Sequence, residues 1–132
     1  FDIAVCIYPT APFVTSEKLE KALQILEVEN ADAVTPVVKY SYPPQRAFVV
    51  REGALQYQFP ENATKRSQDL EPIYHDCGQF YIYDVEKYRA CRGDLPDGYF
   101  PIEVPELEVQ DIDNMSDWKL AEIKYQMMKE CK

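Results

Sequence analysis

Basic residues and histidine are scarce in this sequence of 132 residues. Fourteen Lys and Arg stand against 23 Asp and Glu, giving a formal net charge of −9, and His75 is the single histidine. Nucleic-acid binding normally needs a basic face that neutralises phosphates, so we expect no nucleic-acid partner. An anionic substrate would need a local basic pocket or a metal ion to offset the overall negative field.

Long hydrophobic runs and the commonest catalytic motifs are also missing. No stretch approaches the ~20 apolar residues of a membrane span, so we expect no membrane partner. The sequence contains no Gly-rich phosphate loop, Ser-His-Asp arrangement or nucleophile elbow. Its first residues, Phe1 to Ile7, lack an initiator Met and are too short and too acidic for a secretion signal. They indicate a strand that has already begun, and so a fragment of a longer protein.

Cysteines are few and widely separated, which argues against a disulfide framework. The chain has four, and none forms a Cys-x-x-Cys pair. This spacing favours a reducing, cytoplasmic location. His75 and Cys77 are too few ligands for a structural zinc site, which usually has four.

The first 38 residues predict a strand, a helix and a second strand. The apolar run Ile3 to Tyr8 is typical of a strand covered on both faces, as in a parallel sheet. Thr15 or Ser16 can cap a helix whose apolar residues recur at helical spacing as far as Leu26. Ala33 to Val38 is a second β-branched run. Together these elements predict a right-handed βαβ unit.

Residues 40–77 interrupt this α/β alternation. Tandem proline in Tyr40 to Pro44 blocks both a helix and a central strand. Ala47 to Val50 and Leu55 to Phe59 flank a glycine turn and predict a hairpin. We interpret residues 40–77 as a β-rich excursion from a single α/β domain over residues 1–132, which also makes a subunit contact.

The α/β character returns after the excursion. Gln79 to Tyr83 predicts a strand, and Asp84 can cap a short helix. Tyr99 to Val104 is strand-like, but Pro101 restricts it to an edge or irregular position. An apolar stripe predicts a final helix from about Ser116 to Lys129.

Asp111 and Asp113 are the strongest candidates for metal ligands. If the stretch is extended, both carboxylates leave the same face, with Ile112 between them. Such a pair suits Mg²⁺, which is usually held by one or two carboxylates together with substrate phosphates. The alternative is a solvated acidic loop that caps a helix, because Asp and Asn are common turn formers.

Positive charge gathers in the excursion at Arg46, Arg51, Lys65 and Arg66. Arginine suits two-point recognition of carboxylate or phosphate, whereas solvated surface charge is the simpler explanation for Arg51 and Lys65. The segment from Tyr74 to Gly78 places polar groups beside a glycine that permits a close backbone approach. Its alternative is a plain turn.

Four segments, in order along nearly the whole chain, resemble the acylneuraminate cytidylyltransferases, also called CMP-sialic acid synthetases. Tyr8-Pro-Thr-Ala-Pro12 resembles their Gln-Pro-Thr-Ser-Pro segment, and Pro43-Pro-Gln-Arg-Ala-Phe48 their His-Pro-x-Lys-Ala-Phe segment. Arg66-Ser-Gln-Asp69 followed by Cys77-Gly-Gln-Phe-Tyr81 is similar to their Arg and Asn-Gly-x-x-Tyr. Asp111-Ile-Asp113 and the helix behind it match the metal-binding Asp-x-Asp. The set looks most like the pseudaminic acid branch.

This resemblance implies a fold, a reaction and a set of site residues. The fold would be an incomplete three-layer, mostly parallel nucleotidyltransferase (GT-A/Rossmann-like) domain. The intact enzyme would be a homodimer that transfers CMP from CTP to a nonulosonic acid and releases pyrophosphate. Asp111 and Asp113 would hold Mg²⁺ as the catalytic and metal-binding residues. The implied substrate-binding residues are Thr10, Arg46, Arg66, Gln68 and Gln79, and the excursion at residues 40–77 would serve in sugar binding and dimerisation.

The chain departs from the family at several positions. Tyr8, Ala11 and Cys77 replace the family's Gln, Ser and Asn, and the family's N-terminal strand and basic glycine-containing loop are absent from this chain. We therefore expect the 132-residue chain alone to be inactive. Two alternatives stay open: CTP-dependent activation of another sugar acid such as a deoxy-octulosonate, and a non-catalytic sugar-binding or interaction module.

Overall fold

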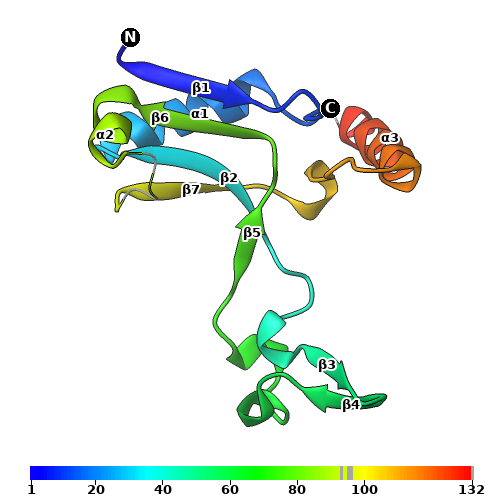
Figure 1. Cartoon of the computed structure of the whole chain (residues 1–132). Helices are drawn as coiled ribbons and strands as arrows, with labels where there is room; N and C mark the ends of the chain where they lie inside the picture. Colours follow the sequence, from blue (N-terminus) through cyan, green and yellow to red (C-terminus); the bar gives the residue numbers. More distant parts are fainter. Residues whose placement is uncertain (93, 95–96, 132) are drawn as a thin grey trace. The chain divides into compact units, whose positions relative to one another are not determined.

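The computed structural model describes residues 1–92, 94 and 97–131 and divides the chain into two compact units (Figure 1). Unit 1 consists of Phe1–Val38 and Asp76–Lys132, and unit 2 is Lys39–His75. Within the described part of the chain, no helix is long and apolar enough to cross a membrane.

A mixed sheet forms the centre of unit 1. β6 pairs in antiparallel fashion with both β1 and β2, whereas β2 and β7 are parallel. The strand order is β1 (Ile3–Ile7), β6 (Phe80–Asp84), β2 (Ala33–Lys39) and β5 (Tyr74–Asp76), with β7 (Tyr99–Glu103) also paired to β2. Strand β5 spans the boundary between the units, since Tyr74 and His75 belong to unit 2 and Asp76 to unit 1.

The prediction of a three-layer, mostly parallel, Rossmann-like sheet is wrong, because the strand pairs are mostly antiparallel. The predicted strand–helix–strand sequence is present, but β6 inserts between β1 and β2 and splits the βαβ unit. An apolar run indicates a strand but carries no information about which strand lies beside it.

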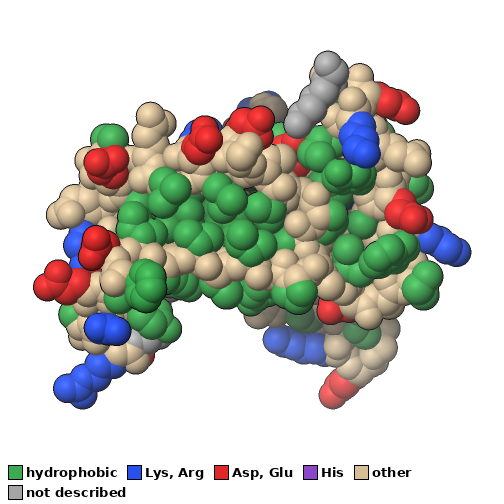
Figure 2. All heavy atoms as spheres, turned by 90° about the horizontal axis from the view of Figure 1, so that it is seen from above, with side chains coloured by type: hydrophobic (Ala, Val, Ile, Leu, Met, Phe, Trp, Pro, Cys, Tyr) green, Lys and Arg blue, Asp and Glu red, His purple; other side chains and the backbone are tan. Residues whose placement is uncertain are grey.

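The prediction that the first strand is covered on both faces is also wrong. Ile3, Val5 and Ile7 keep 47%, 46% and 49% of their surface exposed. Figure 2 views the molecule from above, the side on which β1 lies in Figure 1, and shows a band of hydrophobic side chains there. Of the described strands, β6 alone pairs with β1.

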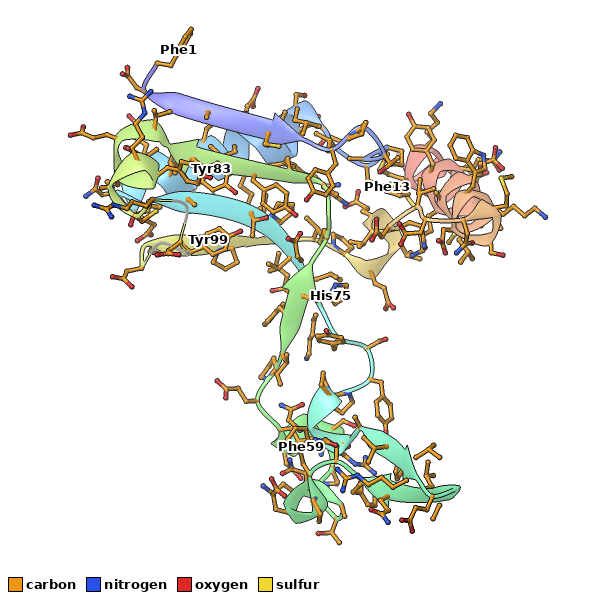
Figure 3. The ribbon with its side chains drawn as sticks, viewed as in Figure 1. Phe1, Phe13, Phe59, His75, Tyr83 and Tyr99 are labelled. Carbon is orange, nitrogen blue, oxygen red and sulfur yellow. The ribbon has the colours of Figure 1, made fainter. Side chains whose placement is uncertain are left out.

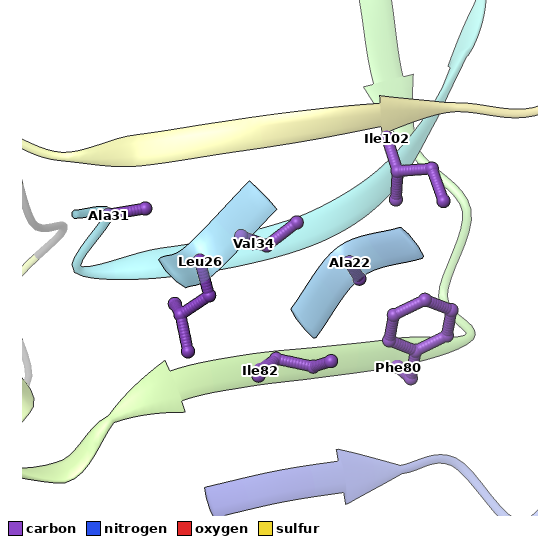
Figure 4. Close-up of a cluster of buried hydrophobic side chains, with 7 residues drawn as sticks. All are labelled: Ala22, Leu26, Ala31, Val34, Phe80, Ile82 and Ile102. Atoms are coloured by element: carbon purple, nitrogen blue, oxygen red, sulfur yellow. The ribbon is translucent and has the colours of Figure 1, made fainter. Parts of the chain in front are cut away.

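Helix α1 (Ser16–Val28) covers one face of the sheet and forms as predicted. The Thr15 hydroxyl caps it by accepting the Lys18 backbone N–H at 3.3 Å. Ala22 and Leu26 are buried against β-strand residues, and Figure 4 shows Leu26 and Ala22 facing Ile82 and Phe80. Complete burial of a side chain such as Phe80 contributes about 1.5–3 kcal/mol. The core cluster comprises Ala22, Leu26, Ala31, Val34, Phe80, Ile82 and Ile102.

Two further helices are set by side-chain caps. α2 (Val85–Ala90) begins after Asp84, whose carboxylate accepts the Lys87 N–H at 2.9 Å, as predicted. α3 (Met115–Glu130) begins after Asn114, which forms a reciprocal capping box with Asp117. The buried ring of Phe13, labelled in Figure 3, packs near α3: its centroid lies 6.2 Å from that of the Tyr125 ring.

Unit 2 contains the predicted hairpin, β3 (Phe48–Arg51) and β4 (Ala54–Tyr57). Its turn residues Glu52 and Gly53 both have positive φ, 52° and 79°, as the favoured two-residue hairpin turn requires. Three short 3₁₀ turns complete the unit: Pro44–Arg46, Pro60–Asn62 and Ser67–Asp69.

Candidate functional site

The loop that carries Asp111 and Asp113 joins the 3₁₀ turn Glu106–Glu108 to α3. Both aspartates are exposed to solvent. The start of the loop is held at two points, because Gln79 Nε2 donates to the Glu108 carbonyl at 2.7 Å and Lys124 Nζ to the Val109 carbonyl at 2.6 Å. The loop is therefore tied to the residue just before β6 on one side and to α3 on the other.

The two aspartates differ in their local bonding. Asp111 Oδ1 accepts the Ile112 backbone N–H at 3.1 Å. The Asp113 backbone N–H donates to Asp117 Oδ2 at 3.1 Å, and so the helix cap also holds the end of the loop. This arrangement leaves the Asp113 carboxylate on the solvent side of a loop whose backbone is fixed at both ends.

Gly78 lies beside Asp111. A Cβ built on Gly78 would meet Asp111 Oδ1 at 3.9 Å, which is ordinary van der Waals contact. Gly78 has a φ of +63°, a conformation that side chains rarely adopt. The backbone of residue 78 thus approaches the first of the two carboxylates.

Sequence analysis singled out the segment from Tyr74 to Gly78 but assigned no role to the carboxylate of Asp76, which also bonds to this glycine. Asp76 Oδ1 accepts the Gly78 N–H at 2.7 Å, and Asp76 Oδ2 accepts the Tyr81 hydroxyl at 2.6 Å. The Tyr81 ring lies 5.3 Å from the Tyr8 ring. Burial, followed by the bond to Asp76, raises the pKa of Tyr81 and keeps its hydroxyl protonated. The available signal was an aspartate two residues before a glycine, which is typical of an Asx turn.

Thr10 lines a mainly apolar pocket of about 330 Å³ that also reaches the acidic loop at Ile112. Trp118 and Tyr125 of α3 form the opposite wall. The structure therefore places predicted residue Thr10 on the same pocket as the residue between the two aspartates.

Gln79 is only 2% exposed. Its Nε2 is bonded to Glu108, as described above, whereas its buried Oε1 has no hydrogen-bond partner among the described residues. In this arrangement Gln79 supports the loop of Asp111, and its predicted contact with a sugar substituent stays a prediction.

Unit 2 carries the other three predicted residues. Arg46 is partly buried, and its Nε has no hydrogen-bond partner among the described residues. The Arg66 side chain is 73% exposed and forms a two-point ion pair with Asp69, at 3.0 and 3.4 Å. Gln68 lines a pocket of about 180 Å³ together with Tyr40. The predicted residues of unit 1 are Thr10, Gln79, Asp111 and Asp113.

Asp111 and Asp113 offer only carboxylate oxygens, the donors that hard divalent cations such as Mg²⁺ take. Over residues 1–92, 94 and 97–131, no group of three or more His, Cys, Asp or Glu side chains is placed to hold an ion. A closed structural site is therefore not built here from protein ligands. Two carboxylates on a fixed loop suit Mg²⁺, which retains waters and takes its remaining ligands from substrate phosphates.

Curated relatives cover almost all of this chain, although no protein-family profile matches it. Pseudaminic acid cytidylyltransferases from two strains of Campylobacter jejuni subsp. jejuni, 81-176 and NCTC 11168, are 31% and 30% identical over 128 residues. These alignments span 96% of this chain and 55% of each relative.

A third relative joins two activities in its name. It is the pseudaminic acid cytidylyltransferase and UDP-2,4-diacetamido-2,4,6-trideoxy-beta-L-altropyranose hydrolase of Helicobacter pylori 26695, 29% identical over 126 residues. The alignment spans 95% of this chain and 24% of that protein. The chain thus spans about half the length of the Campylobacter relatives and a quarter of this one. Along nearly its whole length, the chain is homologous to pseudaminic acid cytidylyltransferases, which confirms the resemblance predicted from its motifs.

Proposed function

We propose that this chain is part of a cytidylyltransferase that transfers CMP from CTP to pseudaminic acid, a nonulosonic acid, and releases pyrophosphate. The observation that carries the proposal is identity of about 30% over 96% of the chain to proteins of that name. Because the chain spans about half of those relatives, the proposed activity is that of the complete gene product.

Asp111 and Asp113 would hold Mg²⁺ in this reaction. The ion, when bound, neutralises phosphate charge and aligns the attack of the sugar hydroxyl on the α-phosphate. The protein contributes a loop whose backbone is already held by Gln79, Lys124 and Asp117. A carboxylate pair on a fixed loop does not need to be ordered during binding, and this lowers the free-energy cost of assembling the site.

Arg46 and Arg66 would bind the carboxylate of the sugar acid. The buried Arg46 Nε is a donor that a ligand acceptor would satisfy. Arg66 already forms a two-point pair with a carboxylate, that of Asp69. Exchanging this exposed partner for a substrate carboxylate costs little, because exposed ion pairs contribute only about 0–1 kcal/mol. Gln68, Gln79 and Thr10 are proposed as hydrogen-bonding groups for the substrates.

We also propose that the complete protein is a homodimer and that unit 2 contributes to the contact. Val50 and Leu55, on facing strands of the hairpin, are 71% and 65% exposed. Val50→Asp with Leu55→Asp should therefore shift the protein to a monomer in light scattering coupled to size-exclusion chromatography. The polar control is Gln56→Asp, and a dimer that survives the double substitution would exclude the hairpin from the contact.

The metal assignment is tested by removing both carboxylates from the complete gene product. Asp111→Ala with Asp113→Ala should reduce Mg²⁺-dependent pyrophosphate release from CTP and pseudaminic acid by at least about 10²-fold. The matched control is Glu106→Ala, which removes an exposed acid just before the loop. Normal Mg²⁺-dependent release by the double variant would refute the assignment.

Two further measurements define the substrate and the active length. A panel of nonulosonic acids and a deoxy-octulosonate in the same assay should show preferential use of pseudaminic acid. The 132-residue chain alone should release no pyrophosphate, because it contains no Gly-rich phosphate loop. Pyrophosphate release by the 132-residue chain would contradict its proposed inactivity. Equal use of all sugar acids would contradict the proposed preference for pseudaminic acid.

A further inference from the structure

Asp76 uses both of its carboxylate oxygens within a six-residue stretch of unit 1. Oδ1 accepts the backbone N–H of Gly78 at 2.7 Å, and Oδ2 accepts the hydroxyl of Tyr81 at 2.6 Å. Short hydrogen bonds to an ionised acceptor are among the stronger ones in proteins. One side chain therefore fixes both the turn after β5 and the partly buried Tyr81 ring on β6.

The two groups held by Asp76 lie against different parts of the candidate site. Gly78 approaches Asp111, as the 3.9 Å distance from its built Cβ to Oδ1 shows. Tyr81 packs on Tyr8, 5.3 Å between ring centroids, and Tyr8 is two residues before Thr10. Between these two contacts, the Tyr8 backbone N–H donates to the Gln79 carbonyl at 2.9 Å. Through Gly78, Asp76 is thus linked to the candidate metal ligand Asp111, and through Tyr81 and Tyr8 it is linked to the segment that carries Thr10.

We propose that Asp76 is a positioning residue, which holds Gly78 against Asp111 and Tyr81 against Tyr8 so that cation and substrate meet a preorganised surface. This inference rests on the proposed cytidylyl transfer and extends it to a residue that neither the motifs nor the relatives assign. Asp76 acts through Gly78 and Tyr81 and not as a ligand of the cation.

Three variants of the complete gene product separate geometry from charge. Asp76→Ala removes both hydrogen bonds. Asp76→Asn can keep both, since its amide oxygen accepts the Gly78 N–H and its NH₂ donates to the Tyr81 oxygen. Tyr81→Phe removes one bond and leaves the charge of Asp76 unchanged. A positioning role predicts that Asn recovers most of the function that Ala loses, whereas a ligand or charge role predicts that it does not.

The kinetic measurement is kcat/KM for pyrophosphate release at several Mg²⁺ concentrations. Asp76→Ala should lose about 10–100-fold, the usual effect of removing a group that orients a metal ligand. Asp76→Asn should recover most of that loss, and Tyr81→Phe should lie between. The proposal would be overturned if kcat/KM fell as far in Asp76→Asn as in Asp76→Ala, or if Asp76→Ala kept the wild-type kcat/KM.

A second readout does not depend on catalysis. The Gly78 amide proton of the wild-type protein should resonate downfield and broaden on addition of Mn²⁺, because it lies beside Asp111. In Asp76→Ala that proton should move upfield, and Mn²⁺ should broaden it only at higher concentration; Asp76→Asn should resemble wild type. If no variant changes the resonance or the titration, positioning by Asp76 is excluded.

The kinetic and Mn²⁺ measurements distinguish a failure of the proposed function from a failure of the positioning role. Wild-type protein that shows no transfer but displays these Mn²⁺ effects would refute the proposed function and leave the positioning role standing. If Asp76→Ala does not fold, as judged by its amide spectrum, Tyr81→Phe carries the test, since it deletes only one hydroxyl. Tyr81→Phe should then keep the wild-type Gly78 shift, because the bond from Gly78 to Asp76 remains, and should lose part of the activity; full activity would contradict the proposal.

Discussion

Unit 1 and unit 2 both contain apolar strand residues but bury them very differently. Unit 1 encloses a cluster in which Phe80, Ile82 and Val34 are completely buried (Figure 4). In residues 39–75, all of which are described, Asn62 is the single buried side chain. A helix covers the sheet of unit 1, whereas the two-stranded sheet of unit 2 has no comparable layer on either face.

Unit 2 is instead held by hydrogen bonds and ring contacts. Asn62 Nδ2 donates to the Gln45 carbonyl at 3.1 Å, and Gln45 Nε2 donates to the Glu71 carbonyl at 2.7 Å. The rings of Phe48 and Tyr57 pair across the hairpin, 4.5 Å apart. Such links specify a conformation but contribute less than a hydrophobic core, so we expect unit 2 to open locally more easily than unit 1.

The largest effect should follow from emptying the core of unit 1. Phe80→Ala should reduce the free energy of unfolding by about 3–5 kcal/mol, because a completely buried ring is replaced by a cavity. Phe48→Ala in unit 2 is the matched control. Its ring is 45% exposed, and we expect a loss of about 1 kcal/mol. Denaturant titration followed by amide signals of each unit measures both, and equal losses would contradict the comparison.

The next effect concerns the polar centre of unit 2. Asn62→Ala should destabilise unit 2 by about 1–3 kcal/mol, because the Gln45 carbonyl loses its partner at a buried position. Amide hydrogen exchange should accelerate in residues 44–62 and stay unchanged in β2 and β6. Thr64→Ala, at an exposed position two residues later, serves as the control. Exchange that accelerates equally in both units would show that they do not open separately.

A smaller, pH-dependent effect is expected from the second hydrophobic cluster of unit 1, which contains Cys77. Burial, helped by the charge of Asp76, raises the pKa of the Cys77 thiol from 9.0 to about 12. The thiol ionises more easily in the unfolded chain, so its contribution to stability is complete below pH 9 and is lost between pH 9 and 12. By pH 10 the loss should be about 1 kcal/mol.

Cys77→Ala should flatten this pH dependence in chemical denaturation at pH 8 and pH 10. The raised pKa values of Tyr81, Tyr83 and Tyr99 also lower stability as the pH rises. They do so equally in the wild type and in Cys77→Ala, and so they cancel when the two proteins are compared. Alkylation at pH 8 gives a second check, because exposed Cys6 and Cys131 should react well before buried Cys77. Identical slopes with and without Cys77 would argue against a raised thiol pKa.

The smallest effect on stability should come from the surface pair of unit 2. Arg66→Met should change the free energy of unfolding by about 0–1 kcal/mol, because both members of the Arg66–Asp69 pair are largely solvated. The same substitution in the complete gene product should raise the KM for the sugar acid. Arg51→Met, in the hairpin, is the charge-matched control, and an unchanged KM in Arg66→Met would remove Arg66 from the proposed site.

Helices and turns of this chain were predictable because their determinants are local. Thr15 and Asp84 cap their helices through bonds to residues three positions later, and Gly53 permits the hairpin turn. The start of α3 was predicted one position too late, since Asn114 forms the capping box with Asp117 and the helix begins at Met115. Motif resemblance to the pseudaminic acid branch is likewise a property of sequence, and the relatives confirm it.

The order of the strands was not predictable in the same way. β1 and β2 carry the apolar runs of adjacent parallel strands, yet β6, which follows only after the whole of unit 2, pairs with both of them. Pairing between distant segments depends on how the whole set of strands and helices packs, which periodicity within one segment does not encode. For the same reason the exposure of Ile3, Val5 and Ile7 could not be inferred from their hydrophobicity.

By itself, the sequence determined the helices and turns, the presence of the acidic pair Asp111 and Asp113, and the similarity to pseudaminic acid cytidylyltransferases. Only the tertiary structure decided that Gly78 lies beside Asp111 and that Asp76 binds both Gly78 and Tyr81. The physical reason is distance along the chain. Caps and turns act over a few residues, whereas residues 78 and 111 come close only when the start of β6 and the acidic loop are packed in one unit.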